Sequence, residues 1–118
     1  AEEALGSQLV AAVPEWAERQ GFADNEVAVQ GATLYAESGC AACHTYLGVG
    51  SANLGAPDLS AIGAGDRGIE FFKNYVANPA DFGNAVMPAF GEEFGGSLDD
   101  EQLTAIATFL DASKGVDE

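Results

Sequence analysis

The sequence contains few residues that bind metals and few that carry positive charge. It has two cysteines, one methionine and one histidine among 118 residues, and 4 basic side chains against 19 acidic ones, a formal net charge of −15. Because nucleic-acid binding rests on neutralising phosphates with lysine and arginine, we expect no nucleic-acid partner. The same balance disfavours an anionic membrane surface. The acid excess suits solubility, a saline habitat or the attraction of a positively charged partner, and composition alone does not separate these.

Long hydrophobic runs and strand patterns are also missing. No apolar stretch is long enough to span a bilayer, so we expect no direct membrane insertion by this chain. Apolar residues recur at helical spacing, and no segment alternates in the way that predicts a strand. A chain of 118 residues is the size of one domain. We therefore predict an all-α domain with long loops.

Both cysteines and the only histidine lie within one pentapeptide, Cys40-Ala41-Ala42-Cys43-His44. Cys-x-x-Cys-His is the attachment signature of a c-type haem. The two intervening residues form about one helical turn, which matches the separation of the two porphyrin vinyl groups that the thiols attack. The next residue, His44, then points its imidazole at the iron from the same side. The motif predicts one haem c, covalently attached through Cys40 and Cys43, with His44 as an iron ligand.

Other interpretations of the motif fit the residues less well. A structural zinc site needs four ligands, and this chain has no cysteine or histidine outside the pentapeptide. A thioredoxin-like dithiol lies near a strand–helix–strand pattern, which this sequence lacks. A disulfide between Cys40 and Cys43 leaves His44 unexplained.

Periodicity and helix-stop residues divide the rest of the chain. They predict helices over 24–39, 67–77 and 97–115, joined by loops over 45–65 and 79–96. Asp24 or Asn25 is expected to cap the first of these helices. The last is expected to open at Ser97, with Asp100 at the spacing of a capping box.

Residues 1–22 carry a helical pattern of their own. Pro14 predicts that this helix ends or kinks, or that a second short helix begins there. We expect the segment to pack back on the domain, and the alternative is a former tether or a partner contact. We accordingly divide the chain into an N-terminal helical extension, residues 1–22, and a main domain, residues 23–118.

The order of these features resembles that of class I c-type cytochromes, the bacterial monohaem type, over residues 24–115. A helix leads into Cys-x-x-Cys-His, then come a Gly-Ala-Pro loop, a middle helix ending in Asn-Pro, a Met-Pro loop and a final amphipathic helix. The resemblance implies the cytochrome c fold, with three to four helices and long loops wrapped around one covalently bound haem. It also implies that His44 is the proximal iron ligand and Met87 the distal one.

The resemblance assigns further positions and also has limits. It implies that the backbone carbonyl of Pro57 accepts a hydrogen bond from His44, and that Gly31 and Tyr35 lie where the first and last helices of the family cross. The chain has Gly-Ala-Pro where many relatives have Gly-Pro, and it lacks the lysines that surround the haem edge in the mitochondrial branch. Residues 1–22 have no counterpart in the family core.

The surroundings of the haem are predicted only in part. Tyr75, Arg67 and Trp16 are candidate contacts of the haem propionates, and no motif selects among them. The segments expected to flank the exposed haem edge, 38–57 and 82–91, carry no acidic, lysine or arginine residue. Acidic residues lie outside them, so we expect a redox partner with a basic docking surface to meet an uncharged haem edge.

Iron held by nitrogen and sulfur on opposite faces has no open site, which predicts an electron-transfer protein and not an enzyme. The alternatives are a peroxidase-like enzyme or a haem-based ligand sensor, and both need a labile distal site. A peroxidase also needs an acid–base residue over the iron, typically histidine, and the only histidine is already used. We expect a monomer, either a free carrier or the soluble domain of a larger respiratory or photosynthetic complex.

Thioether attachment of haem implies export. We therefore expect an extracytoplasmic protein, in the periplasm or at the outer face of the cytoplasmic membrane. No charged-then-apolar leader opens the chain, which suggests a mature or trimmed form.

Overall fold

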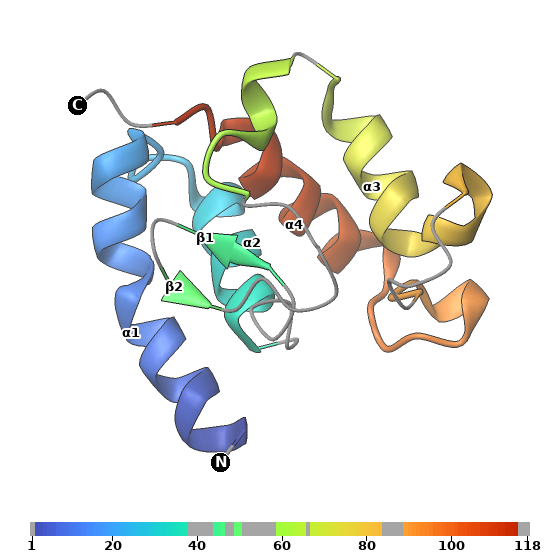
Figure 1. The fold of residues 1–118 in the computed structure, drawn as a ribbon, viewed down its shortest axis with the longest axis horizontal. Coiled ribbons are helices and arrows are strands. Elements are labelled where there is room, and N and C mark those ends of the chain that lie inside the picture. Colours follow the sequence, from blue (N-terminus) through green and yellow to red (C-terminus); the bar gives the residue numbers. More distant parts are fainter. Residues whose placement is uncertain are drawn as a thin grey trace.

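The fold is built from helices. The computed structural model describes residues 2–37, 44–46, 49–50, 59–65, 67–83 and 89–115. Within them lie the α-helices α1 (Glu2–Gln20), α2 (Glu26–Glu37), α3 (Ile69–Ala77) and α4 (Asp100–Ala112), shown in Figure 1. Single 3₁₀ turns join them at η3 (Ile62–Gly65), η4 (Pro79–Phe82) and η5 (Glu92–Phe94). The predicted all-α fold is confirmed.

A short antiparallel hairpin follows directly after His44. Strand β1 (Thr45–Tyr46) pairs with β2 (Val49–Gly50). The sequence had predicted only loop over 45–65, so this hairpin and η3 correct that prediction. Strands of two residues are too short to show the alternation from which a strand is predicted.

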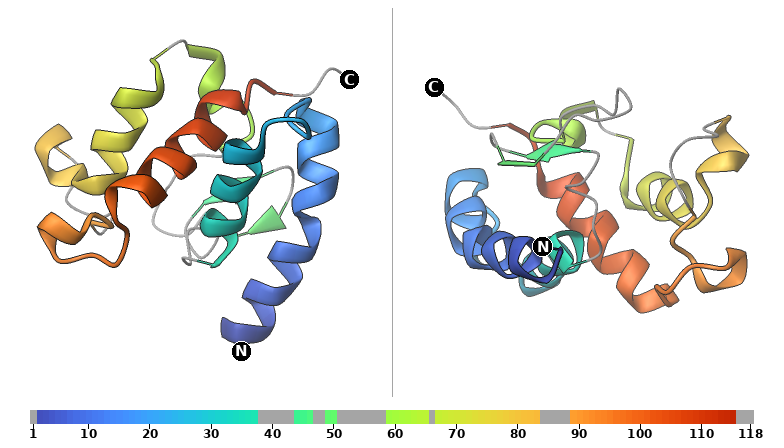
Figure 2. Two further views of the ribbon diagram at one scale, coloured as in Figure 1. Left: turned by 180° about the vertical axis from the view of Figure 1, so that it is seen from behind. Right: turned by 60° about the horizontal axis from the view of Figure 1, so that its bottom comes forward.

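The centre of the fold is the crossing of α2 and α4, which both views in Figure 2 show. Gly31 of α2 lies so close to α4 that a Cβ atom there would overlap the carbonyl oxygen of Ala105. Along the same face of α2, the ring of Tyr35 packs on Phe109 with centroids 5.4 Å apart. The expectation that Gly31 and Tyr35 lie at a helix crossing is therefore confirmed. On the far side of α4 lies α3.

Helix α1 runs past Pro14 without ending there, so the expected end of the helix, or start of a second one, is wrong, and a kink at Pro14 stays a prediction. Pro14 is exposed, and its ring removes one backbone hydrogen bond from the helix. Buried residues on both sides of it, Val13, Trp16 and Ala17, press the helix against the rest of the protein and offset this loss. The expected packing of the segment on the domain is confirmed, while a domain boundary at residue 22 stays a prediction.

Polar side chains fix the starts of α2 and α4. Asn25, one of the two predicted caps, accepts a hydrogen bond from the first turn of α2 at 3.1 Å. At α4 the carboxylate of Asp99 accepts from the Gln102 N–H at 2.8 Å, and the Gln102 amide oxygen accepts from the Asp99 N–H at 2.9 Å. The predicted start at Ser97 is wrong, because the N-cap of α4 is Asp99. Three residues after Asp99 stands Gln102, whose side chain is long enough to reach back to the Asp99 N–H, whereas Asp100, three residues after Ser97, has a shorter side chain.

Candidate haem-binding site

Of the predicted haem contacts the structure describes His44 and the three candidate propionate contacts Tyr75, Arg67 and Trp16, and His44 and Tyr75 are half-buried. His44 stands immediately before β1, so its backbone leads into the hairpin. The remaining predicted contacts lie outside the described residues: Cys40, Cys43, Pro57 and Met87. The roles assigned to all these residues stay predictions.

The chain just after His44 is anchored in the protein interior. Tyr46 is fully buried, and the centroid of its ring lies 4.8 Å from that of Trp16 and 4.9 Å from that of Phe109. Its hydroxyl lies 2.7 Å from the hydroxyl of Ser113, which directly follows α4. The hairpin segment is thereby tied to both α1 and α4.

Neither Tyr46 nor Ser113 was predicted from the sequence as part of the site. One signal was present for Tyr46, which is the only aromatic residue between positions 45 and 65, in a segment otherwise rich in glycine, alanine and serine. Burying a lone large ring in such a segment is favourable, because the ring then removes a large apolar area from water. No local pattern marks Ser113, since its partner lies 67 positions away.

Tyr75 belongs to a second aromatic cluster, on α3 and η4. Its ring stacks on Phe82 with centroids 5.0 Å apart and lies 5.8 Å from Phe71. Phe82 is 44% exposed, so this cluster reaches the protein surface. A half-exposed aromatic cluster just before the Met87 segment is apolar surface suited to covering a haem.

The other two candidate propionate contacts have separate surroundings. The guanidinium of Arg67 lies 5.3 Å from the ring centroid of Phe71, in cation–π geometry, and the residue is exposed. Arg67 thus lies in the same cluster as Tyr75. Trp16 is 1% exposed and packs instead among Tyr46 and the α2–α4 rings. Packing in the hydrophobic core is enough to explain the position of Trp16, without a contact to a propionate.

The donor groups fit a haem better than a metal centre made by the protein. Among the described residues, no group of three or more histidine, cysteine or carboxylate side chains is arranged to hold a metal ion. A half-buried imidazole with one methionine elsewhere in the chain is the donor set of an iron whose equatorial ligands come from a porphyrin. The residues present therefore fit a haem.

A groove with an acidic rim lies between α3, η5 and the start of α4. Ala77, Leu98 and Leu103 form its apolar floor. The rim carries the half-exposed ring of Phe94, with Glu92 and Glu93 beside it.

The only base in the lining of this groove is already paired. Lys73 Nζ lies 2.7 Å from the carboxylate of Asp100. The hydrogen bond to Asp100 raises the pKa of Lys73, and the Coulombic attraction of Asp100 and Glu70 adds to the rise. The groove therefore presents a negative rim.

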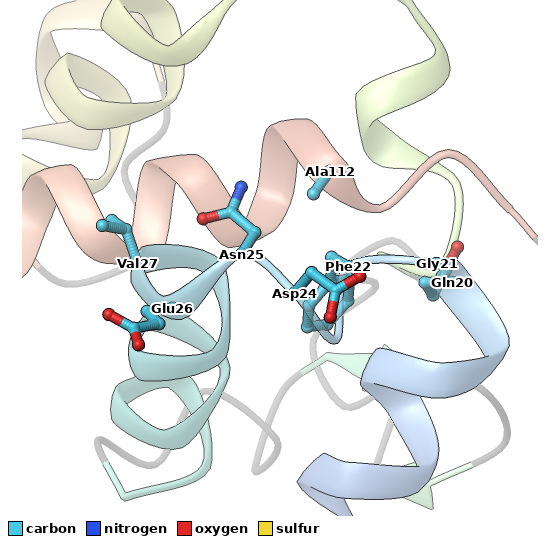
Figure 3. Close-up of a pocket in the computed structure, with 8 residues that line it drawn as sticks. All are labelled: Gln20, Gly21, Phe22, Asp24, Asn25, Glu26, Val27 and Ala112. Atoms are coloured by element: carbon cyan, nitrogen blue, oxygen red, sulfur yellow. The ribbon is translucent and has the colours of Figure 1, made fainter.

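A second depression lies at the surface between the α1–α2 turn and the end of α4 (Figure 3). Its lining includes the exposed side chains of Asp24, Glu26 and Val27. None of the described predicted haem contacts, His44, Tyr75, Arg67 and Trp16, is among the described residues of its lining.

Comparison with known proteins places the chain in a family. The sequence model of the Cytochrome c family matches residues 28–114, and the chain belongs to the cytochrome c family. It is thus a haem-binding electron-transfer domain with the all-α cytochrome c fold. No curated protein and no solved structure matches the chain. Helix α1 lies outside the matched residues.

No helix among the described residues is both long enough and apolar enough to cross a membrane.

Proposed function

We propose that this protein carries single electrons between redox proteins by means of one haem c. In this proposal Cys40 and Cys43 attach the haem, and His44 and Met87 bind its iron from opposite faces. The observation that carries the proposal is the match of residues 28–114 to the Cytochrome c family, which covers all four residues. We place the protein outside the cytoplasm, in the periplasm or at the outer face of the cytoplasmic membrane, as a free carrier or a domain of a larger complex.

The haem supplies the one-electron chemistry, and this chain's residues hold it and set its surroundings. Ligation by both His44 and Met87 leaves no iron position for a substrate, and a thioether ligand favours the reduced state. In this proposal the backbone carbonyl of Pro57 accepts a hydrogen bond from the imidazole nitrogen of His44 that does not bind iron. This bond would fix the orientation of the imidazole ring. Tyr75 and its aromatic neighbours Phe71 and Phe82 are suited to excluding water from the haem.

Mass and spectroscopy test this proposal directly. Under denaturing conditions the exported protein should have the mass of the polypeptide plus one haem, and replacing both Cys40 and Cys43 by serine should abolish this adduct. The reduced protein should show a low-spin spectrum that carbon monoxide leaves unchanged. Apoprotein mass in correctly exported material contradicts haem attachment. Immediate binding of carbon monoxide instead supports a peroxidase-like enzyme or a ligand sensor.

We further propose that the partner docks through a basic surface. The net charge of −15 and the groove rim at Glu92 and Glu93 support this. Exposed Phe94, 47% accessible, adds an apolar contact that is released easily, while the surrounding carboxylates attract the partner over a distance.

Ionic strength and charge reversal test the docking surface. With a lysine-rich redox protein as the acceptor, the bimolecular rate should fall about tenfold from roughly 0.01 M to 0.15 M salt, as the Debye length shrinks from about 30 Å to about 8 Å. At low salt, Glu92→Lys with Glu93→Lys should slow the reaction several-fold. Glu15→Lys with Glu18→Lys, exposed on α1, is the control with equal charge change. Rates independent of salt, or equal loss in both pairs, contradict docking at the groove.

A further inference from the structure

We infer that Tyr46 is the residue that positions His44, and that α1 keeps Tyr46 in place through Trp16. The inference rests on the proposed role of His44 as an iron ligand. It gives a role to α1, which lies outside the residues matched by the Cytochrome c family.

A directed chain of hydrogen bonds fixes the hydroxyl of Tyr46. The Ser113 hydroxyl donates to the carbonyl oxygen of Phe109 at 2.8 Å. A serine hydroxyl has only one proton to donate, so the Tyr46 O–H must be the donor in the 2.7 Å bond to Ser113 Oγ. Both side chains are fully buried, and a buried hydroxyl without its partner is costly, so the bond holds the ring in one place.

Packing holds the same ring from two sides. Trp16 of α1 and Phe109 of α4 lie at nearly equal centroid distances from the Tyr46 ring, 4.8 and 4.9 Å. All three rings are 1% exposed or less. Close aromatic contacts of this kind are worth about 0.5–1.5 kcal/mol each beyond the apolar area that they bury. Removal of either neighbour would leave Tyr46 with a cavity to move into.

Helix α1 is itself fixed where it carries Trp16. At its end, the Gln20 side chain donates to the Ser60 carbonyl oxygen at 2.6 Å and accepts from the Gly115 N–H at 3.0 Å. Figure 3 shows Gln20 at the end of α1, with Phe22 in the turn that follows. The Phe22 ring then packs on Phe109 with centroids 5.7 Å apart. The helix that holds Tyr46 is thus joined to the same end of α4 that Tyr46 contacts.

Only Thr45 separates His44 from this anchor. Two consecutive residues span at most about 7 Å of backbone, so a fixed Tyr46 restricts where the His44 backbone lies. His44 is only half-buried, whereas Tyr46 is fully buried. Alteration of the groups that contact and orient a metal ligand typically changes the affinity and the redox potential of the metal. Tyr46 therefore acts through His44 and does not itself touch the haem in this proposal.

The test compares Tyr46→Phe with a matched control in the holoprotein. Tyr46→Phe keeps the ring and removes the hydroxyl, and Ser113→Ala removes the acceptor of the same bond. Thr108→Val is the control, because it removes a partly buried hydroxyl of α4 that is bonded to the Thr104 carbonyl oxygen at 2.7 Å. The readouts are the hyperfine-shifted proton resonances of the His44 ring and the reduction potential.

We expect Tyr46→Phe and Ser113→Ala to shift the His44 ring resonances and the reduction potential alike, each in the same direction in both variants. Trp16→Phe puts a smaller ring on α1 and so reduces the contact with Tyr46. It should move the same readouts in the same direction. Thr108→Val should lower only the unfolding free energy. Wild-type resonances and potential in Tyr46→Phe and Ser113→Ala overturn the inference and leave Tyr46 as a core residue. Failure of the proposed function is seen separately, as wild-type protein without covalent haem or as His44→Ala protein with an unchanged low-spin spectrum.

Discussion

Replacing Gly31 by valine is expected to destabilise the protein severely. A Cβ atom built at Gly31 would overlap the carbonyl oxygen of Ala105 and lie 2.5 Å from its carbonyl carbon and 2.9 Å from the Ile106 nitrogen. All of these are backbone atoms of α4, which cannot swing aside as the end of a long side chain can. The branched side chain must therefore push α2 and α4 apart.

Separating these helices opens the centre of the core. Tyr35 and Phe109, whose rings lie 5.4 Å apart, are carried by the two helices near the crossing and would lose contact. Overpacking typically destabilises a protein by about 1–3 kcal/mol, and a clash with rigid backbone exceeds that range. We expect a loss of more than about 3 kcal/mol, which is a large part of the stability of a small domain.

Denaturant unfolding of the holoprotein measures this effect. Gly31→Ala, the smallest step, should already shift the unfolding midpoint clearly, and Gly31→Val should go further. Gly65→Ala is the control, because the nearest atom to a Cβ at Gly65, on the flexible Arg67 side chain, is 3.9 Å away. Equal midpoints for Gly31→Ala and Gly65→Ala would show that α2 and α4 do not approach as closely at Gly31 and Ala105 as the structure has them.

The same crossing shows what the sequence was able to predict. A glycine inside a helix is unfavourable by about 1 kcal/mol relative to alanine, so Gly31 already indicated a close neighbour. The family resemblance then paired it with Tyr35. Asn25 was predicted as a helix cap because its signal is local, within the first turn of α2. Features that depend on residues close together in the sequence, such as a helix cap or a glycine within a helix, were therefore predictable.

Features that depend on tertiary packing were not. A helix end at Pro14 followed a correct local rule, but burial of Trp16 and Val13 keeps α1 continuous. The contact of Tyr46 with Ser113 joins residues that are 67 positions apart, and no periodicity reports such a pairing. At the candidate site the sequence named the ligands through a motif, which identifies residue types. What holds His44 in place from behind came only from the three-dimensional arrangement.

Replacing Met87 by alanine is expected to change the redox chemistry more than any other single substitution in the distal half of the site. Met87 is the only methionine, and Pro88 after it restricts its backbone. Loss of the thioether should abolish the sulfur-to-iron charge-transfer band and lower the reduction potential, because the sulfur ligand favours the reduced iron. The reduced protein should also bind carbon monoxide at once, since an iron position becomes available.

Optical spectra and potentiometry of the Met87→Ala holoprotein provide the measurement. Phe90→Leu is the control, because Phe90 follows closely in the chain, is half-buried and has no group that binds iron. The control should keep the band, the potential and the resistance to carbon monoxide. Covalent haem mass should be the same in both variants, so that loss of the ligand is separated from loss of the haem.

An unchanged band in Met87→Ala would assign the distal position to Lys73, Asn84 or another group. The structure already argues against Lys73, whose Nζ lies 2.7 Å from the carboxylate of Asp100, at the groove between α3 and α4. To bind iron, Lys73 would have to break this ion pair and also lose its proton, although Asp100 and Glu70 raise its pKa and so favour the protonated form. Raising the pH would therefore favour lysine ligation, whereas ligation by the Met87 thioether would release no proton.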